Sequence, residues 1–97
     1  MQLLTDELRE IIPPFYSSED IELEDKMVYA KFFLENWTWY ILEYDKDSNT
    51  FFALVDGLDR ELGYVSLNEL EQVRGHMDLR IERDLYFTSV KYKDLKI

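Results

Sequence analysis

The sequence predicts an α+β fold: a single domain over residues 1–97, with an antiparallel meander of four or five strands and two or three short helices packed on it. The stretch Trp37–Tyr44 carries large side chains on both sides of an extended chain. Two further apolar runs, Phe51–Val55 and Leu62–Val65, each follow a short turn-forming segment. The 97 residues are 46% hydrophobic and 15% aromatic, enough to close one core without cysteine, which is absent.

The stretch Trp37–Tyr44 is expected to be the central strand, because bulk on both faces requires cover on both sides. Strict alternation puts Trp37, Trp39 and Ile41 on one face and Tyr40, Leu42 and Tyr44 on the other. The Trp37/Trp39 face could be a stacking platform. Core packing is favoured, because large aromatic side chains are the main core filler in this chain.

The N-terminal stretch Thr5–Ile12 predicts a short helix with Thr5 as its N-cap. Its apolar face at helical spacing is expected to dock on the sheet and consists of Leu4, Leu8, Ile11 and Ile12. Pro13-Pro14 ends the helix, and Phe15 and Tyr16 anchor the chain beyond it.

The next segment, Ser17–Lys26, has five acidic residues and one basic residue and predicts a mobile loop, with Ile21 and Leu23 as weak tethers. Met27–Leu34 follows as one strand, in which Val28, Ala30, Phe32 and Leu34 share a face. Glu35-Asn36 makes a two-residue hairpin turn into the central strand.

Local residue patterns also predict the elements of the second half of the chain. Turns are expected at Asp45–Asn49 and Asp56–Glu61. Ser66 and Glu69 form a capping box for a helix that runs to about Val73 and is stopped by Gly75. The expected remainder is an extended segment over Leu79–Phe87 and a tail, Thr88–Ile97, that forms a short helix or a loose edge.

The net charge of −10 is unevenly distributed. Residues 1–61 hold 15 acidic and 5 basic residues, whereas residues 62–97 hold 6 of each. Such a field repels nucleic acid and membranes and attracts basic proteins. The alternative is that the charge serves solubility alone. The candidate partner-binding residues are Glu19, Asp20, Glu22, Glu24, Asp25, Asp45, Asp47, Asp56, Asp59 and Glu61.

No metal, cofactor or catalytic residue is predicted. Asp45, Asp47, Asn49 and Asp56 match positions of a calcium-loop template. Thr50 stands where the bend needs Gly, and the terminal Glu is missing, so a hairpin turn is favoured. No glycine-rich phosphate loop occurs.

The stretch Arg74–Asp84 holds the densest mixture of charges and the single histidine, His76. A histidine beside carboxylates could act as a general base. No nucleophile is marked near it, so surface ion pairs are favoured, and Arg83, between Glu82 and Asp84, is interpreted as one of them.

Much of the chain resembles the bacterial family of unknown function DUF2958, found largely on plasmids, conjugative elements and phages. The segments that carry the resemblance are Leu3–Thr5, Pro13–Ser17, Val28–Phe33, Asn36–Tyr40 (NWTWY), Phe51–Gly57, Leu62–Tyr64, Leu70–Gly75 and Ile81–Leu85 (IERDL). His76-Met77-Asp78 departs from the family's Pro-Leu-Gly-like run. The resemblance implies a small mobile-element cargo protein and brings no established catalytic residues.

These observations predict a non-enzymatic, cytoplasmic binding protein of a mobile element. Its acidic surface would engage a basic host or element-encoded protein, such as a defence nuclease, by presenting a nucleic-acid-like negative charge. Direct binding to nucleic acid or membrane is not expected. The alternatives are a small enzyme that uses Arg74–Asp84, or an accessory structural subunit of an element-encoded complex.

Overall fold

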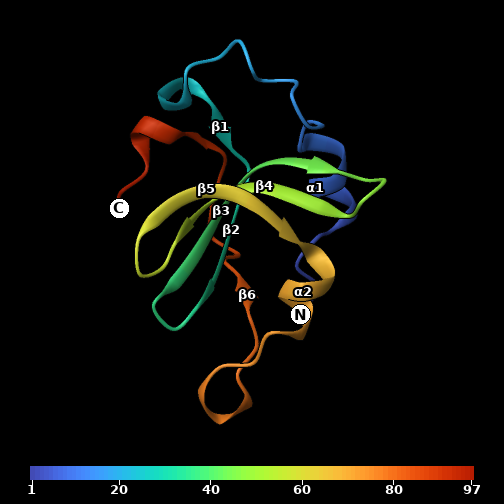
Figure 1. Cartoon of the computed structure of the whole chain (residues 1–97), viewed down its shortest axis with the longest axis vertical. Coiled ribbons are helices and arrows are strands. Elements are labelled where there is room, and N and C mark those ends of the chain that lie inside the picture. Colours follow the sequence, from blue (N-terminus) through green and yellow to red (C-terminus); the bar gives the residue numbers. More distant parts are fainter.

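The computed structural model describes residues 1–97 and has the predicted α+β architecture (Figure 1). Five strands form an antiparallel sheet in the order β5-β4-β3-β2-β6, and β1 pairs with β7 in a separate two-stranded sheet. The elements are α1 (Asp6–Ile11), η1 (Leu23–Asp25), β1 (Met27–Val28), β2 (Ala30–Leu34), β3 (Trp37–Asp45), β4 (Thr50–Asp56), β5 (Arg60–Ser66), α2 (Leu67–Gln72), η2 (His76–Asp78), β6 (Glu82–Arg83), β7 (Val90–Lys91) and η3 (Tyr92–Asp94), the η elements being 3₁₀-helices.

The central position of β3 is as predicted, but its alternation breaks once. The register with β4 shifts between Ile41 and Glu43, so Leu42 is the extra residue of a β-bulge. Tyr44 therefore lies opposite Phe51 and joins the same core cluster as Ile41. The prediction that Tyr44 shares a face with Leu42 is wrong, because the bulge resets the period of two.

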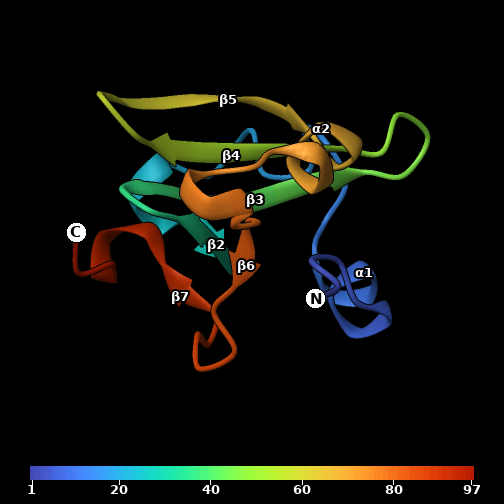
Figure 2. The same ribbon diagram turned by 90° about the horizontal axis from the view of Figure 1, so that it is seen from below.

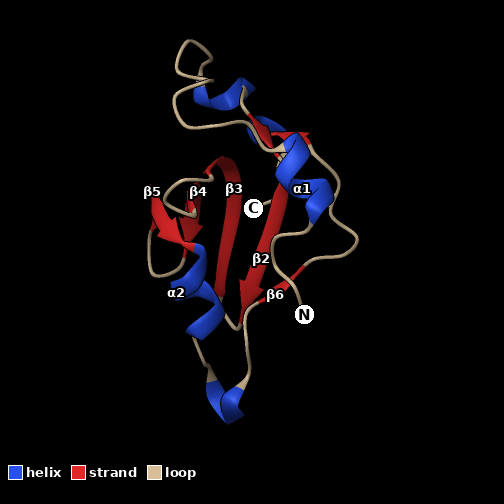
Figure 3. Ribbon diagram, turned by 90° about the vertical axis from the view of Figure 1, so that its right-hand side faces the viewer, coloured by secondary structure: helices blue, strands red, loops and turns tan.

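The first face of the sheet is covered by the N-terminal segment and α2, which Figure 3 shows on the viewer's side of the strands. A cluster of 14 buried residues fills this layer, including Leu4, Phe32, Phe51 and Leu70. Thr5 caps α1, its hydroxyl accepting the Leu8 N–H at 3.2 Å, as predicted. Ile11 is exposed, in contrast to the prediction that it docks on the sheet, because α1 ends there.

The second face is covered by η1 and the C-terminal segment, on the left of the sheet in Figure 1. Its buried cluster is small and consists of Val28, Tyr40, Leu42 and Leu54. Tyr29 splits the strand predicted over Met27–Leu34. Its N–H donates to the Ile41 carbonyl at 2.9 Å, while Ala30 also pairs with Ile41. Val28 therefore turns to the second face, away from Ala30 and Phe32.

Several predicted boundaries are confirmed and others need correction. The three hairpin turns lie where expected, and Ser66 caps α2 by accepting the Glu69 N–H at 3.3 Å. Gly75 does not stop the helix, because the chain is already extended at Val73. The segment predicted as extended over Leu79–Phe87 contains the two-residue strand β6 and an isolated β-bridge between Arg80 and Arg74. The tail forms β7 and the short helix η3, which begins at Tyr92 and has no side-chain cap, so the short-helix alternative is the one that holds.

The prediction that the Trp37/Trp39 face packs in the core holds for only one of the two residues. Trp39 is 7% exposed and belongs to the first-face cluster, whereas Trp37 is 41% exposed at the end of β3. None of the helices combines the length and apolar character needed to cross a bilayer.

Candidate functional site: the acidic segment and a groove on the same face

A buried carboxylate organises the second face. The bulge at Leu42 places Glu43 opposite Phe52, and Glu43 is 5% exposed. Its Oε1 accepts the Tyr16 N–H at 3.1 Å, and its Oε2 accepts the Ser18 N–H at 3.3 Å and the Ser18 hydroxyl. Glu43 therefore anchors the segment that the sequence predicts to be a mobile loop.

Lys26 closes the same segment from its other end. Its ammonium group donates to the backbone carbonyl of Ser18 and, at 3.1 Å, to the Ser18 hydroxyl oxygen. Between these two anchors the chain makes turn hydrogen bonds and the short helix η1, from which Leu23 packs against the second-face cluster. Ile21, predicted to be a second tether, is exposed. We call residues 17–26 the acidic segment.

All five carboxylates of the acidic segment are exposed, and they belong to Glu19, Asp20, Glu22, Glu24 and Asp25. Asp25 lies 3.5 Å from the Lys93 ammonium group in η3. The other four have no basic side chain within ion-pair distance. The segment therefore presents a largely uncompensated run of negative charge on an anchored backbone.

The other five candidate acidic residues lie elsewhere. Asp45 and Asp47 lie at the β3–β4 turn, whereas Asp56, Asp59 and Glu61 lie at the β4–β5 turn. These turns lie on opposite sides of the molecule in Figures 1 and 2, at the two ends of β4. The ten residues therefore form three separate groups, not one continuous surface.

Two of these residues have local partners. Asp45 Oδ2 accepts the Ser48 N–H at 3.1 Å and the Ser48 hydroxyl at 2.5 Å, which is the hydrogen bonding of a turn. Asp56 Oδ2 lies 3.5 Å from Arg60 Nε. Since β4 separates Asp45 from Asp56, they are not neighbours as in a calcium loop. No three His, Asp or Glu side chains are grouped to hold a metal ion, and the absence of a metal site stays a prediction.

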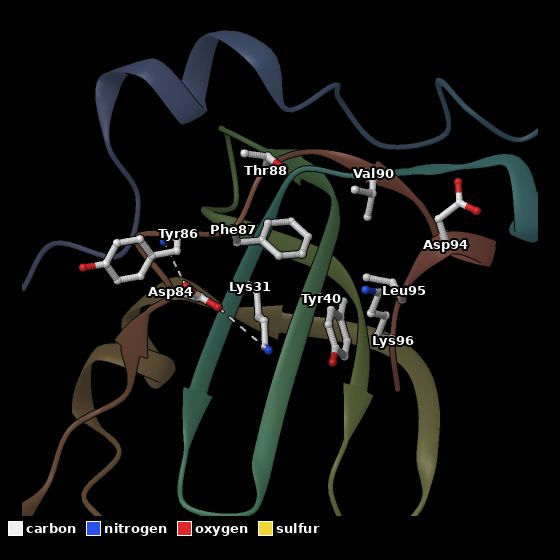
Figure 4. Close-up of a pocket in the computed structure, with 10 residues that line it drawn as sticks. All are labelled: Lys31, Tyr40, Asp84, Tyr86, Phe87, Thr88, Val90, Asp94, Leu95 and Lys96. Atoms are coloured by element: carbon white, nitrogen blue, oxygen red, sulfur yellow. Dashed lines mark hydrogen bonds and ion pairs between the residues drawn. The ribbon is translucent and has the colours of Figure 1, made fainter.

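A groove of about 430 Å³ opens on the second face, between the sheet and the C-terminal segment (Figure 4). Lys31 and Tyr40 lie side by side on β2 and β3, with Phe87 and Leu95 next to them. The Lys31 ammonium group is 3.9 Å from Asp84 Oδ2 and 6.0 Å from the centre of the Tyr40 ring. The groove is therefore partly aromatic and carries charges of both signs.

The phenol in this groove stays protonated at neutral pH. Burial raises the pKa of Tyr40 above its usual value, the negative charge of Asp56 raises it further, and Arg60 opposes the shift. Tyr40 can therefore donate or accept a hydrogen bond but is a poor base. The arrangement suits binding better than proton transfer.

The stretch Arg74–Asp84 contains two ion pairs, as predicted. Arg74 Nε lies 3.7 Å from Asp78, and Asp84 pairs with Lys31. Arg83 differs from the prediction, because it makes no ion pair and its Nε is buried without a hydrogen-bond partner. His76 is exposed on η2.

Sequence reasoning missed Glu43. The signal was present, since Glu43 is the one charged residue inside the apolar run from Trp37 to Tyr44. A charge in such a run requires either an exposed edge or buried partners. It also missed the pair Tyr16 and Tyr64, whose side-chain hydrogen bond is the main cause of the raised pKa of Tyr64.

Residues 3–93 match the family described as Protein of unknown function (DUF2958). No curated protein and no solved structure matches the chain significantly. The match covers the acidic segment, all strands of the main sheet, and the residues that line the groove except Asp94, Leu95 and Lys96.

Proposed function

We propose that this chain, which belongs to the DUF2958 family, is a non-enzymatic protein that binds a basic protein surface through its acidic segment. The family's description assigns no activity, so the proposal rests on the chain's own residues. The observation that carries it is the anchoring by Glu43 and Lys26 of a segment with five exposed carboxylates.

Anchoring favours binding because the segment has less conformational freedom to lose. A loose acidic loop gives up backbone and side-chain entropy when it meets a partner. Here Glu43 accepts hydrogen bonds from two backbone N–H groups, and Lys26 donates one to a backbone carbonyl, before any partner binds. The remaining cost is mainly that of ordering the exposed carboxylate side chains.

The proposed partner is a host or element-encoded protein that handles DNA or RNA, because such proteins carry basic grooves. The acidic segment would occupy that groove in place of the phosphate backbone. The proposed setting is the bacterial cytoplasm, and the proposed origin is a plasmid, phage or conjugative element, where inhibition of a host defence nuclease would protect incoming DNA.

The two turn groups have a different role in this proposal. Asp45 and Asp47 lie at one end of β4, and Asp59 and Glu61 lie at the other. The two groups therefore do not belong to a single contact surface. Exposed charges farther away than about 10 Å are largely screened at physiological salt. In this proposal, the charges of these residues attract the basic partner before contact and speed its association.

The experiment compares two variants with the same change in net charge, using a partner recovered from host lysate. In the first, the five acidic side chains of the acidic segment become Asn or Gln. In the matched control, five exposed acidic residues on the helices of the other face are neutralised, namely Asp6, Glu7, Glu10, Glu69 and Glu71. Association rates are measured at low and physiological salt.

The first variant is expected to associate several-fold more slowly and to lose most of its salt dependence, while the control stays close to wild type. Single substitutions have little effect, because an exposed pair contributes only about 0–1 kcal/mol. If the charge serves solubility alone, both variants aggregate more readily and keep the wild-type rate, which would refute the proposal. No specific observation favours the enzyme or subunit alternative.

A further inference from the structure

A second cavity, of about 320 Å³, lies at the end of the sheet away from the acidic segment. It forms where the β2–β3 turn meets the segment after α2, and Figures 1 and 3 both show these two segments side by side. The residues that matter here are Glu35, Trp37, Trp39, Val73, Arg74 and Gly75. The volume is at the small end of the range for small-molecule sites.

Two parallel indole rings form one wall of this cavity. The ring centres of Trp37 and Trp39 are 6.2 Å apart, with an angle of 23° between the planes. Trp39 is fixed by the core. Trp37 rests against Gly57, where an added Cβ would come within 2.3 Å of the ring. The outer indole is thus held in position while 41% of its surface stays exposed, which makes it a preformed stacking surface.

The rim of the cavity carries one fixed cation and one fixed anion. Arg74 Nη1 donates to the carbonyls of Glu71 and Val73, both at 2.9 Å, and Nε lies 3.7 Å from Asp78. Glu35 Oε1 accepts the His76 N–H at 2.5 Å. Neither Arg74 Nη2 nor Glu35 Oε2 has a hydrogen-bond partner in the chain, so one donor and one acceptor are free beside the stacking surface.

Gly75 permits this juxtaposition of charges. A Cβ at Gly75 would come within 2.6 Å of Glu35 Oε1 and 3.2 Å of Leu34. A larger residue would therefore push the β2–β3 turn away from the Arg74 segment.

We infer that this cavity binds a purine base of a free nucleoside or nucleotide, guanine in preference to adenine. A purine ring can stack on an indole ring, and this stacking occurs with any base because every base has a π-face. The edge of guanine carries N–H groups that can donate hydrogen bonds to the Glu35 carboxylate. It also carries O6 and N7, which can accept hydrogen bonds from the Arg74 guanidinium group. A longer nucleic acid is disfavoured because the chain carries a net charge of −10.

The test is calorimetric titration of the full chain with guanosine, guanosine monophosphate, inosine and adenosine. Saturable binding of guanosine and its monophosphate at one site is expected, with adenosine several-fold weaker. Trp37→Ala should weaken guanosine binding at least tenfold, because base–aromatic stacking is the main attraction. Trp37→Phe keeps a ring against Gly57 and should retain part of the affinity. Tyr86→Ala is the matched control, an exposed aromatic residue outside this cavity, and should change nothing.

Glu35→Gln provides a test that leaves the apolar core unchanged, because Glu35 is exposed in the β2–β3 turn. It should reduce the preference for guanosine over inosine, because inosine lacks the exocyclic amino group that would donate a hydrogen bond to Glu35. The inference is overturned if wild type binds none of these compounds, or if Trp37→Ala and Trp37→Phe bind as wild type does. It is also overturned if a short single-stranded DNA or a tryptophan-containing peptide binds in this cavity more tightly than guanosine monophosphate.

Discussion

The two faces of the sheet are held in different ways. The first face buries a continuous cluster of 14 apolar residues under the N-terminal segment and α2. The second face buries only four, and its cover is fixed by polar anchors such as Glu43 and Lys26. Apolar burial supplies most of the stability of a small domain. We therefore expect the first face to determine global unfolding and the second to govern the local state of the acidic segment.

The largest expected effect is on the first face. Trp39→Ala removes a buried indole and should lower the free energy of unfolding by about 3–5 kcal/mol, a large part of the total for a small domain. Trp37→Ala, two residues away, should cost only about 1 kcal/mol, because its stacking with Trp39 is partly exposed. Chemical denaturation measures both. Equal losses would mean that the end of β3 is as deeply packed as its centre.

A smaller and more local effect is expected on the second face. Glu43→Ala leaves the N–H groups of Tyr16 and Ser18 without acceptors and should cost about 1–3 kcal/mol. Hydrogen exchange should accelerate in residues 16–26 more than in β3 or β4, because the anchor is local. Glu43→Gln keeps one carbonyl acceptor and should fall between wild type and Glu43→Ala. Uniform acceleration across the sheet would contradict the distinction between the faces.

The meander from β2 to β5 and its hairpins could be predicted because they depend on local patterns, whereas the pairing of β6 with β2 and of β1 with β7 could not. Alternation identifies Trp37–Tyr44, and Asp, Asn, Gly and Ser mark the turns. The bulge at Leu42 and the break at Tyr29 could not be predicted. Both residues look like ordinary strand residues, and the position of each irregularity depends on how both faces of the sheet pack at once. Each irregularity moves a neighbouring side chain, Tyr44 or Val28, to the other face.

The candidate site was predictable in composition but not in arrangement. The charge count identifies the acidic segment, yet it cannot show that Asp45 and Asp59 lie at opposite ends of β4. Arg83 shows the same limit, since it forms no ion pair with its acidic neighbours in sequence: Asp84 pairs with Lys31, and Arg83 Nε has no partner. Residues adjacent in an extended chain face opposite sides, so proximity in sequence is poor evidence for an ion pair.

The ion pair between Asp25 and Lys93 should contribute about 0–1 kcal/mol, because both side chains are half exposed. A double-mutant cycle with Asp25→Asn and Lys93→Gln measures their coupling. High salt should remove it. A coupling well above this range would show that η1 and η3 dock through charge and not through the second-face apolar cluster.

The smallest expected effect appears only in alkali and concerns Tyr40. Burial holds the pKa of Tyr40 above its unfolded value of 10.0, Asp56 adds to the shift, and Arg60 reduces it. A group whose pKa is raised by folding contributes stability below the unfolded pKa and loses that contribution as the pH rises through the folded pKa.

Wild type should therefore lose stability above about pH 10, part of it because the unfolded state releases the Tyr40 proton first. The comparison with Tyr40→Phe isolates the phenol, because the two proteins differ only in this hydroxyl group. Relative to wild type, Tyr40→Phe should be more stable at about pH 11 than at about pH 8, because Phe has no proton to lose. Denaturant midpoints across this range provide the measurement. Parallel curves for the two proteins would mean that the hydroxyl is as well solvated in the groove as in the unfolded chain.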